Sequence, residues 1–415
     1  MPERLISVVG AFAMLALAFA LCPADRRHAV NRRTVGTGVL LLVAIGVLVL
    51  RTPVRGLFDL ANTGVERLLA YSHDGAVFVF GKLADERAFG FVFAVQVLPT
   101  ILFFSALMSL LYHYGVLPLV IERLGRALAR WLAVSGAESF STVADVFVGQ
   151  TEAPLAIRPY LESMTLSELN ACMVAGFATT AGGVLAAYVA MLSAAVPGIA
   201  GHLIACSVMS APASLVVAKL MLPEVEPTAT GGELRVAIPK TTANALDAIA
   251  AGATDGLKLA ANVAAMLLVF LAFTAFANAV FGWLGLRLFG VPLTLEELLG
   301  WVFSPLAWLL GVPSGDVTKI GSLLGQKTVL NEFVAYSRLS EMLARDPHWL
   351  SERGRLVTTY ALCGFANFGS IGVQIGGYSS LAPGRRSDLS RLSFRAMLGG
   401  FLATNLVACV AGVLL

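Results

Sequence analysis

Charged residues are scarce in this chain of 415 residues. Asp, Glu, Lys and Arg make up 13% of it, about half of the roughly 25% that is typical of soluble domains. Hydrophobic residues make up 57%, and the mean hydropathy is +0.80. The net charge of +3 is too small to indicate a nucleic-acid partner. These values exclude a soluble α/β enzyme, a disordered protein and a DNA-binding module, and they favour a membrane protein with many helices.

Cysteine and histidine are also few, with five of each. The cysteines lie in or beside apolar stretches and form no CxxC pair, so we expect neither a disulfide framework nor a zinc site. The histidines form no HExxH motif. Because no nucleophile elbow or metal-ligand set is present either, the chain is not expected to be an enzyme.

Long apolar runs predict most of the membrane spans. A helix needs about 20 apolar residues to cross the hydrocarbon core. Residues 53–90 mix apolar and charged positions and predict a helix in the membrane interface. A second interfacial helix is predicted around Arg123, Arg126 and Arg130, which share one helical face. The predicted spans are 6–22, 36–50, 92–118, 198–222, 258–286 and 393–415.

Two regions are too polar and too rich in Gly, Pro, Ser and Thr to be lipid-facing helices. They are residues 133–165 and 311–350, and both lie between strongly apolar runs. Irregular backbone at membrane depth is tolerated only where protein or a water-filled cavity surrounds it. The polar segment 223–250 is predicted to be an exposed connection between two halves of the chain.

The two halves carry similar motifs in the same order. Gly149-Gln150 precedes Gly176-Phe177-Ala178 in the first half, and Gly325-Gln326 precedes Gly364-Phe365-Ala366 in the second. Paired segments interrupted by Gly or Pro, one in each half, indicate the binding site of a secondary transporter. A hairpin that turns back inside the membrane leaves free N–H and C=O groups there, and these groups can bind a polar solute or a cation.

Three longer motifs resemble those of the concentrative nucleoside transporter family. Residues 146–155 (VFVGQTEAPL) and 157–160 (IRPY) resemble the family's first re-entrant hairpin. Residues 331–336 (NEFVAY) resemble its second hairpin, and residues 364–372 (GFANFGSIG) resemble its broken substrate-binding helix. The resemblance implies an all-α integral membrane protein with about eight transmembrane helices plus two re-entrant helical hairpins in an inverted repeat, with interfacial helices.

That plan divides the chain into four parts. Scaffold and interfacial helices occupy 1–132, and the first repeat occupies 133–222. The polar connection and a long scaffold helix occupy 223–310, and the second repeat occupies 311–415. The resemblance further implies a homotrimer in the lipid bilayer of the bacterial inner membrane, which imports nucleosides by cation symport with elevator-type alternating access and needs no cofactor.

The resemblance also assigns roles to single positions. In the family, the first hairpin contacts the nucleobase, an apolar position on the following helix and a phenylalanine lie near the base, and the second hairpin with its broken helix holds the ribose. Glutamine and carboxylate groups can pair with a base edge and with ribose hydroxyls. The substrate residues so implied are Gln150, Thr151, Glu152, Val184, Glu332, Phe365, Asn367 and Ser370.

A cation site is implied at Asp145, the Val148 carbonyl, Thr179 and Thr180. Sodium-coupled relatives usually carry asparagine where this chain has Asp145. An unpaired buried carboxylate takes up a proton, whereas one beside a cation stays ionised. Asp145 therefore serves a sodium site or a proton-coupled symporter, and the Thr179 hydroxyl with backbone oxygens slightly favours sodium.

One other function is less compatible with the sequence. A passive nucleoside channel would need rings of like charge or regular backbone carbonyls, and the isolated polar segments supply neither. The sequence leaves the choice between purine and pyrimidine nucleosides open.

Overall fold

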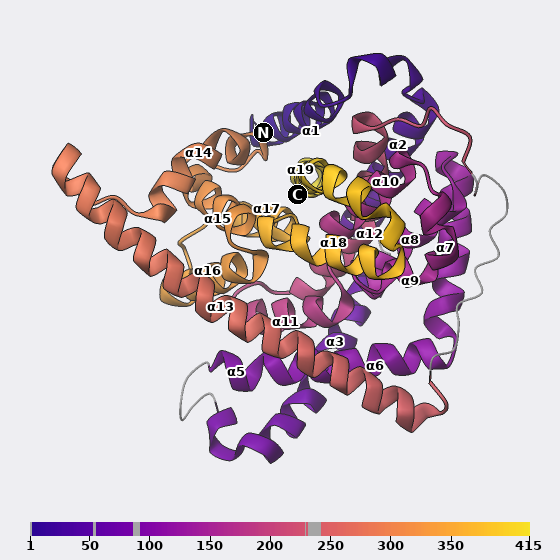
Figure 1. The fold of residues 1–415 in the computed structure, drawn as a ribbon. Helices are drawn as coiled ribbons and strands as arrows, with labels where there is room; N and C mark the ends of the chain where they lie inside the picture. The colour runs from indigo at the N-terminus through magenta and orange to yellow at the C-terminus, as the bar shows by residue number, and fades with distance from the viewer. Residues whose placement is uncertain (1, 53–54, 86–91, 229, 231–241) are drawn as a thin grey trace.

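The chain forms a bundle of helices of very different lengths (Figure 1). The computed structural model describes residues 2–52, 55–85, 92–228, 230 and 242–415, without the side chains of 55–59, and these residues form helices and no strand. The α-helices are α1 (Pro2–Ala20), α2 (Arg32–Arg51), α3 (Arg55–Phe80), α5 (Phe93–Gln96), α6 (Leu98–His113), α7 (Val116–Leu132), α8 (Gly136–Phe147), α9 (Ala153–Ala156), α10 (Leu166–Ala178), α11 (Gly182–Leu192), α12 (Ile199–Met221), α13 (Ala245–Phe289), α14 (Leu295–Leu309), α15 (Val317–Val329), α16 (Glu332–Arg345), α17 (Glu352–Leu362), α18 (Phe368–Leu381) and α19 (Arg386–Leu414). Short 3-10 helices occupy Ala24–Ala29, Gly81–Ala84, Arg158–Ser163, Ser314–Asp316 and Pro383–Arg385.

Within these described residues, seven helical segments are long and apolar enough to cross a membrane. Six of them correspond to the spans predicted from the sequence. The seventh, Leu166–Leu192, comprises α10 and α11 with a break between them. The seven segments are Pro2–Ala20, Arg32–Arg51, Phe93–His113, Leu166–Leu192, Ile199–Met221, Ala245–Phe289 and Pro383–Leu414.

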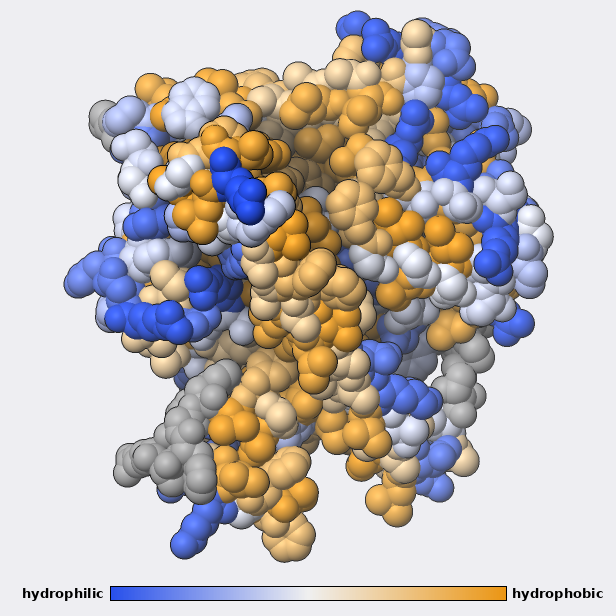
Figure 2. All heavy atoms as spheres, turned by 60° about the vertical axis from the view of Figure 1, so that its left-hand side comes forward, coloured by the Kyte–Doolittle hydropathy of each residue, from blue (hydrophilic) through white to orange (hydrophobic). Residues whose placement is uncertain are grey.

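Three of these spans form the centre of the bundle. The apolar windows of Ile199–Met221, Leu166–Leu192 and Pro383–Leu414 are 89%, 83% and 78% buried inside the protein, whereas that of α13 is 11% buried. The central helix α12 packs against α2, α10 and α19. In the view of Figure 2, apolar side chains cover a broad region through the middle of the face, and hydrophilic side chains gather toward its margins. An apolar outer surface is expected for a protein whose solvent is lipid.

Four helix breaks interrupt the interior. In the first half, residues 148–152 separate α8 from α9 and residues 179–181 separate α10 from α11. In the second half, residues 330–331 separate α15 from α16 and residues 363–367 separate α17 from α18. The order of helix, break and helix is therefore the same in both halves. The regions that the sequence singled out as irregular contain the α8–α9 and α15–α16 breaks.

The Gly-Gln and Gly-Phe-Ala motifs that indicated the repeat occupy different positions relative to the helices in the two halves. Gly149-Gln150 lies in the break after α8, whereas Gly325-Gln326 lies inside α15. Gly176-Phe177-Ala178 is the last turn of α10, whereas Gly364-Phe365-Ala366 lies in the break after α17. The two halves therefore share the order of helix ends, and the residues of the two motifs are not at equivalent positions.

The two helices predicted for the membrane interface are both present as helices. The arginines 123, 126 and 130 of α7 lie opposite a buried stripe that includes Leu117, Ile121 and Leu128. The other predicted segment, 53–90, contains α3, which is not among the segments apolar enough to span; residues 53–54 and 86–90 of it lie outside the described residues.

The connection predicted to be exposed, 223–250, differs from that prediction in two places. Helix α13 already begins at Ala245. Thr230 is buried, and its hydroxyl donates a hydrogen bond to Glu168 (2.8 Å) while its carbonyl accepts one from the backbone N–H of Gly136 (3.1 Å). This residue therefore satisfies polar groups at the starts of α8 and α10. Residues 229 and 231–241 lie outside the described part of the chain.

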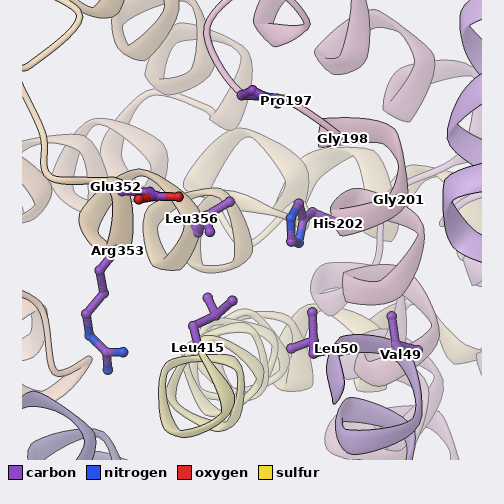
Figure 3. Close-up of a pocket in the computed structure, with 10 residues that line it drawn as sticks. All are labelled: Val49, Leu50, Pro197, Gly198, Gly201, His202, Glu352, Arg353, Leu356 and Leu415. Carbon is purple, nitrogen blue, oxygen red and sulfur yellow. The ribbon is translucent and has the colours of Figure 1, made fainter. Parts of the chain in front are cut away.

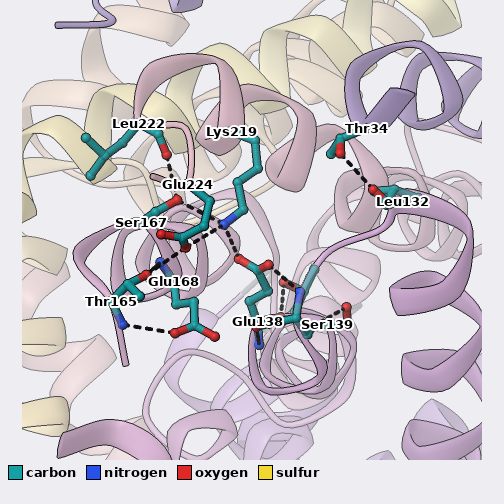
Figure 4. A network of polar contacts seen from close by, with 12 residues as sticks. Thr34, Leu132, Glu138, Ser139, Thr165, Ser167, Glu168, Lys219, Leu222 and Glu224 are labelled. Carbon is teal, nitrogen blue, oxygen red and sulfur yellow. Dashed lines mark hydrogen bonds and ion pairs between the residues drawn. The ribbon is translucent and has the colours of Figure 1, made fainter. Parts of the chain in front are cut away.

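A buried ion pair joins the end of α12 to the start of α8 (Figure 4). Lys219 in the last turn of α12 lies 2.6 Å from Glu138 in the first turn of α8, and its Nζ also donates to the Ser167 hydroxyl (2.9 Å). Glu138 and Glu168 each complete a capping box at the start of their helices. These contacts fix the ends of α8, α10 and α12 to one another.

Candidate functional site

A cavity of about 730 Å³ lies where the helix breaks of the two halves meet. The first half contributes the segment from Phe147 to Glu152, and the second contributes residues from both of its breaks. Helices α6 and α13 close the cavity from outside the repeats. All eight predicted substrate residues line it: Gln150, Thr151, Glu152, Val184, Glu332, Phe365, Asn367 and Ser370.

Two helices begin at the second-half side of this cavity. Asn331 caps α16 by accepting a hydrogen bond from the backbone N–H of Val334 (2.9 Å), and Asn367 caps α18 by accepting one from that of Ser370 (2.8 Å). Helix N-termini carry a partial positive charge and favour negative or electron-rich groups. Both helix starts therefore provide a favourable environment for the carboxylate of Glu332, the first residue of α16.

The Glu332 carboxylate is buried and bonded on both oxygens. Asn367 donates from Nδ2 to one oxygen (2.8 Å), and the Tyr188 hydroxyl donates to the other (3.2 Å). Each carboxylate oxygen can accept more than one hydrogen bond. The group thus keeps acceptor capacity for hydroxyl groups of a bound solute, while its position is fixed from α11 and from the second-half break.

The first-half side of the cavity presents Gln150, Thr151 and Glu152. The Thr151 hydroxyl donates to Glu152 (2.7 Å). The Gln150 side-chain oxygen accepts from Nε2 of Gln374 (3.1 Å), which also donates to the Met173 carbonyl (3.0 Å). This bond fixes the orientation of the Gln150 amide through its oxygen, so the NH2 group of Gln150 points away from Gln374. Gly149 has φ +95°, which allows this turn.

One of the four residues of the predicted cation site belongs to the lining of this cavity. Val148 lines the cavity, but Asp145, Thr179 and Thr180 do not. The Thr179 hydroxyl donates to the Ala175 carbonyl (2.9 Å). The Thr180 hydroxyl accepts a hydrogen bond from the backbone N–H of Gly364 (2.9 Å), so it links the two halves.

Asp145 is fully buried near the end of α8, and both of its carboxylate oxygens lack a hydrogen-bond partner within the described structure. A Cβ placed on Gly176 would lie 3.6 Å from Asp145 Oδ1, and one placed on Gly149 would lie 2.7 Å from the Cβ of Ala181. The break after α8 therefore packs against the break after α10. A buried carboxylate without a partner is unfavourable, and its environment fits a bound cation or a proton.

Sequence reasoning missed several residues that shape the cavity. Tyr188 and Gln374 orient Glu332 and Gln150, but both lie in the middle of helices, where no local pattern marks them. Asn331 had a visible signal, because an asparagine directly before a helical segment is a typical N-cap. Three polar residues of α13 also line the cavity, and they are Asp255, Lys258 and Asn262.

A second cavity of about 410 Å³ lies apart from these residues (Figure 3). His202 and Arg353 line it from α12 and α17, and Leu415 lines it from the end of the chain. None of the predicted site residues belongs to it. The His202 ring is bonded to the Tyr360 hydroxyl (3.0 Å).

Comparison with known proteins covers nearly the whole chain. Residues 9–83 match the model of the Na+ dependent nucleoside transporter N-terminus, and residues 202–412 match that of its C-terminus. Residues 94–195 match a model described as nucleoside recognition.

Related proteins agree with these matches. An uncharacterized transporter of Haemophilus influenzae is 43% identical over 99% of this chain and 97% of its own length. The sodium/nucleoside cotransporter 1 of Rattus norvegicus is 42% identical over the whole chain, which spans 64% of the rat protein.

Solved structures share the fold. CNTnw in an inward-facing substrate-bound state has a TM-score of 0.92 and 44% identity, covering 99% of this chain and 98% of that one. A CNTnw variant in an outward-facing state gives the same TM-score with 43% identity, covering 100% of this chain and 98% of that one. This chain therefore belongs to the Na+-dependent nucleoside transporter family, which is a family of transporters and not of enzymes.

Proposed function

We propose that this protein imports nucleosides across the bacterial inner membrane by cation symport. The observation that carries the proposal is the single cavity that all eight predicted substrate residues line. Its volume of about 730 Å³ falls within the range of roughly 300–1,000 Å³ that is typical of small-molecule sites.

The chemistry of the cavity matches the two parts of a nucleoside. In the proposed arrangement, Gln150, Thr151 and Glu152 pair with the edge of the base, while Val184 and Phe365 contact its apolar face. Glu332, Asn367 and Ser370 hold the ribose hydroxyls. Hydrogen bonds to a charged acceptor contribute about 1.5–3 kcal/mol each. The existing bond between Asn367 and Glu332 supports this role, because it holds both groups at one place in the cavity.

Sodium is the favoured coupling ion, with Asp145, the Val148 carbonyl, Thr179 and Thr180 as its proposed ligands. The unpartnered carboxylate of Asp145 and the Thr179 hydroxyl are hard oxygen donors, which suit this cation. The family and its rat relative are described as sodium-dependent. The alternative is a proton-coupled symporter in which Asp145 itself carries the proton.

The driving force is sufficient for concentrative uptake. One charge that crosses 100 mV supplies about 2.3 kcal/mol. At about 1.4 kcal/mol for each tenfold ratio, this energy supports a substrate gradient of roughly fifty-fold.

Alternating access is proposed to move the two repeats, residues 133–222 and 311–415, as one substrate-bearing body in an elevator-type motion. The Thr180–Gly364 hydrogen bond between the halves supports movement as a single unit. CNTnw structures in inward-facing and outward-facing states support alternating access in this family. We further propose a homotrimer in the bilayer, to be checked by the mass of the purified protein in detergent.

Uptake of labelled uridine by proteoliposomes tests the proposal. We expect saturable accumulation that unlabelled nucleosides inhibit and that an inward sodium gradient drives. Accumulation driven by a proton gradient alone would favour the alternative. If neither gradient drives accumulation, the symport proposal is wrong, and uptake without saturation would indicate a channel.

The variant Asp145→Asn separates the two coupling ions. An amide oxygen can still bind sodium but cannot carry a proton at neutral pH. We expect this variant to retain sodium-driven uptake with a higher sodium requirement, measured as the sodium concentration for half-maximal uptake. Complete loss of gradient-driven uptake, with uridine binding retained, would contradict the sodium assignment.

A further inference from the structure

One buried cation lies at the helix breaks without facing the substrate cavity. The side chain of Lys327 in α15 is fully buried. Its Nζ donates to the carbonyl oxygens of Ala361 (2.9 Å) and Cys363 (3.3 Å) and to the hydroxyl oxygen of Thr404 (3.2 Å). Within the described structure, no carboxylate lies at ion-pair distance from it. Three neutral oxygens therefore hold one positive charge.

The carbonyls that bind Lys327 belong to a helix terminus. Helix α17 ends at Leu362, so the carbonyls of its last turn have no partner within the helix. A helix C-terminus carries a partial negative charge that favours a cation. The ammonium group of Lys327 therefore satisfies the broken end of α17.

Lys327 occupies the position in the second repeat that Asp145 occupies in the first, when both are counted from the end of their helix. Asp145 lies two residues before the end of α8, which is Phe147, and Lys327 lies two residues before the end of α15, which is Val329. The next helices show the same correspondence. Thr179 directly follows the end of α10, and Cys363 directly follows the end of α17. Each repeat thus has one of these two residues near the end of its first interrupted helix, followed by a second helix that is also interrupted.

The ends of α10 and α17 also lie close together in space. The backbone N–H of Gly364 donates to the Thr180 hydroxyl, and the Cys363 sulfur lies 3.4 Å from the same oxygen. A Cβ on Gly364 would lie 2.8 Å from the Ala178 carbonyl oxygen. The end of α10 is therefore in direct contact with the break after α17. Asp145, whose carboxylate has no hydrogen-bond partner among the described residues, lies beside Gly176 in the last turn of α10. The ammonium of Lys327 binds the end of α17 and has three acceptors.

From this arrangement we propose that the ammonium of Lys327 is a tethered cation that permanently fills the second repeat's counterpart of the exchangeable cation site at Asp145. The inference rests on the proposed cation site of the first repeat. It has a direct consequence for coupling. The wild-type protein carries one exchangeable cation per nucleoside, because the second site already contains a covalently attached charge. Removing that charge while leaving the oxygens in place creates a second cation site.

Two substitutions at Lys327 differ in what they leave behind. Lys327→Ser removes the charge and leaves a space beside the oxygens of Ala361, Cys363 and Thr404. Lys327→Met removes the same charge but fills the space with an apolar chain of similar length. A sodium ion or a hydrated cation can enter the first variant and not the second, so the methionine variant is the matched control.

The first measurement is the ratio of labelled sodium to labelled uridine taken up by proteoliposomes. We expect a ratio of one for the wild type and two for Lys327→Ser. A ratio of two in the wild type, or of one in Lys327→Ser, would overturn the inference.

The second measurement needs no transport. The melting temperature of each purified full-length protein is recorded in sodium chloride and in choline chloride. We expect sodium to stabilise Lys327→Ser more than it stabilises either the wild type or Lys327→Met. An equal response of the serine and methionine variants to sodium would overturn the inference. Wild-type protein that accumulates no uridine would contradict the proposed function instead, and the melting temperatures would still decide the role of Lys327.

Discussion

At the scale of single residues, the Glu332 carboxylate is the group on which substrate binding should depend most. It is buried at the start of α16 and held by Asn367 and Tyr188. Replacing it with glutamine removes the charged acceptor and weakens its hydrogen bonds by about 1.5–3 kcal/mol. We expect Glu332→Gln to weaken uridine binding by about ten- to hundredfold, as measured by calorimetry.

A matched control for this substitution lies on the same helix. Glu341 also belongs to α16, but it is exposed and pairs with Arg338 and Arg345 outside the cavity. Glu341→Gln should leave uridine affinity unchanged, because exposed ion pairs contribute little. Equal uridine affinity of the two variants would contradict the assignment of Glu332 to the proposed ribose site.

The sequence could predict the cavity residues that lie at helix ends, because they occur in short contiguous motifs. Gln150 to Glu152 and Glu332 are of this kind. It could not predict Tyr188, Gln374 or Lys327, because each lies inside a helix and bonds to a partner far away in the chain. Such partners become visible only when the packing of the breaks is known.

At the scale of helical elements, the break after α17 depends on Gly364. This residue has φ +105°, where a side chain is strained, and a Cβ there would lie 2.8 Å from the Ala178 carbonyl oxygen. We expect Gly364→Ala to destabilise the protein by about 1–3 kcal/mol from backbone strain alone, and so to lower its melting temperature in detergent. Gly372→Ala in α18 is the control, because a Cβ there meets nothing within 4 Å. A helical glycine replaced by alanine should be neutral or stabilising, so equal melting temperatures for the two variants would contradict this account.

The ion pair between Lys219 and Glu138 predicts a second effect on helix ends. Removing one partner of a buried pair leaves the other charge unpaired, which costs about 3–5 kcal/mol. We expect Lys219→Met to lower the melting temperature strongly. Adding Glu138→Gln to it should restore part of the loss, because the unpaired charge is then absent. If the double variant is less stable than the single one, the ion pair is not the cause.

The sequence predicted the existence of the helix breaks better than their positions. Regions 133–165 and 311–350 were identified by their polarity, and each contains a break. The Gly-Gln motif did not mark the same position in both halves, since Gly325-Gln326 lies within α15 and not at its end. A helix can end in the interior where its free backbone groups find partners, and Lys327 is such a partner for the carbonyls at the end of α17. A single sequence does not reveal these partners.

At the scale of the whole molecule, composition was sufficient to predict a helical membrane protein, since low charge and long apolar runs reflect the surrounding lipid. The ion pair of Lys219 and the bond from Thr230 to Glu168 had no such signal. They involve polar residues near helix ends, where the sequence cannot distinguish an exposed loop from a buried network.

The length of α13 relates the whole molecule to the thickness of its membrane. Residues 259–286 of this helix contain no charged side chain, and at about 1.5 Å per residue they extend for about 42 Å. The hydrocarbon core measures about 30 Å, so a steep inclination is needed to avoid hydrophobic mismatch. Because α13 also lines the cavity, we expect uridine uptake to change when the acyl chains of the liposomes are lengthened or shortened. Uptake that is independent of acyl-chain length would contradict this expectation. It would mean that α13 changes its inclination without altering the part of the cavity that it lines.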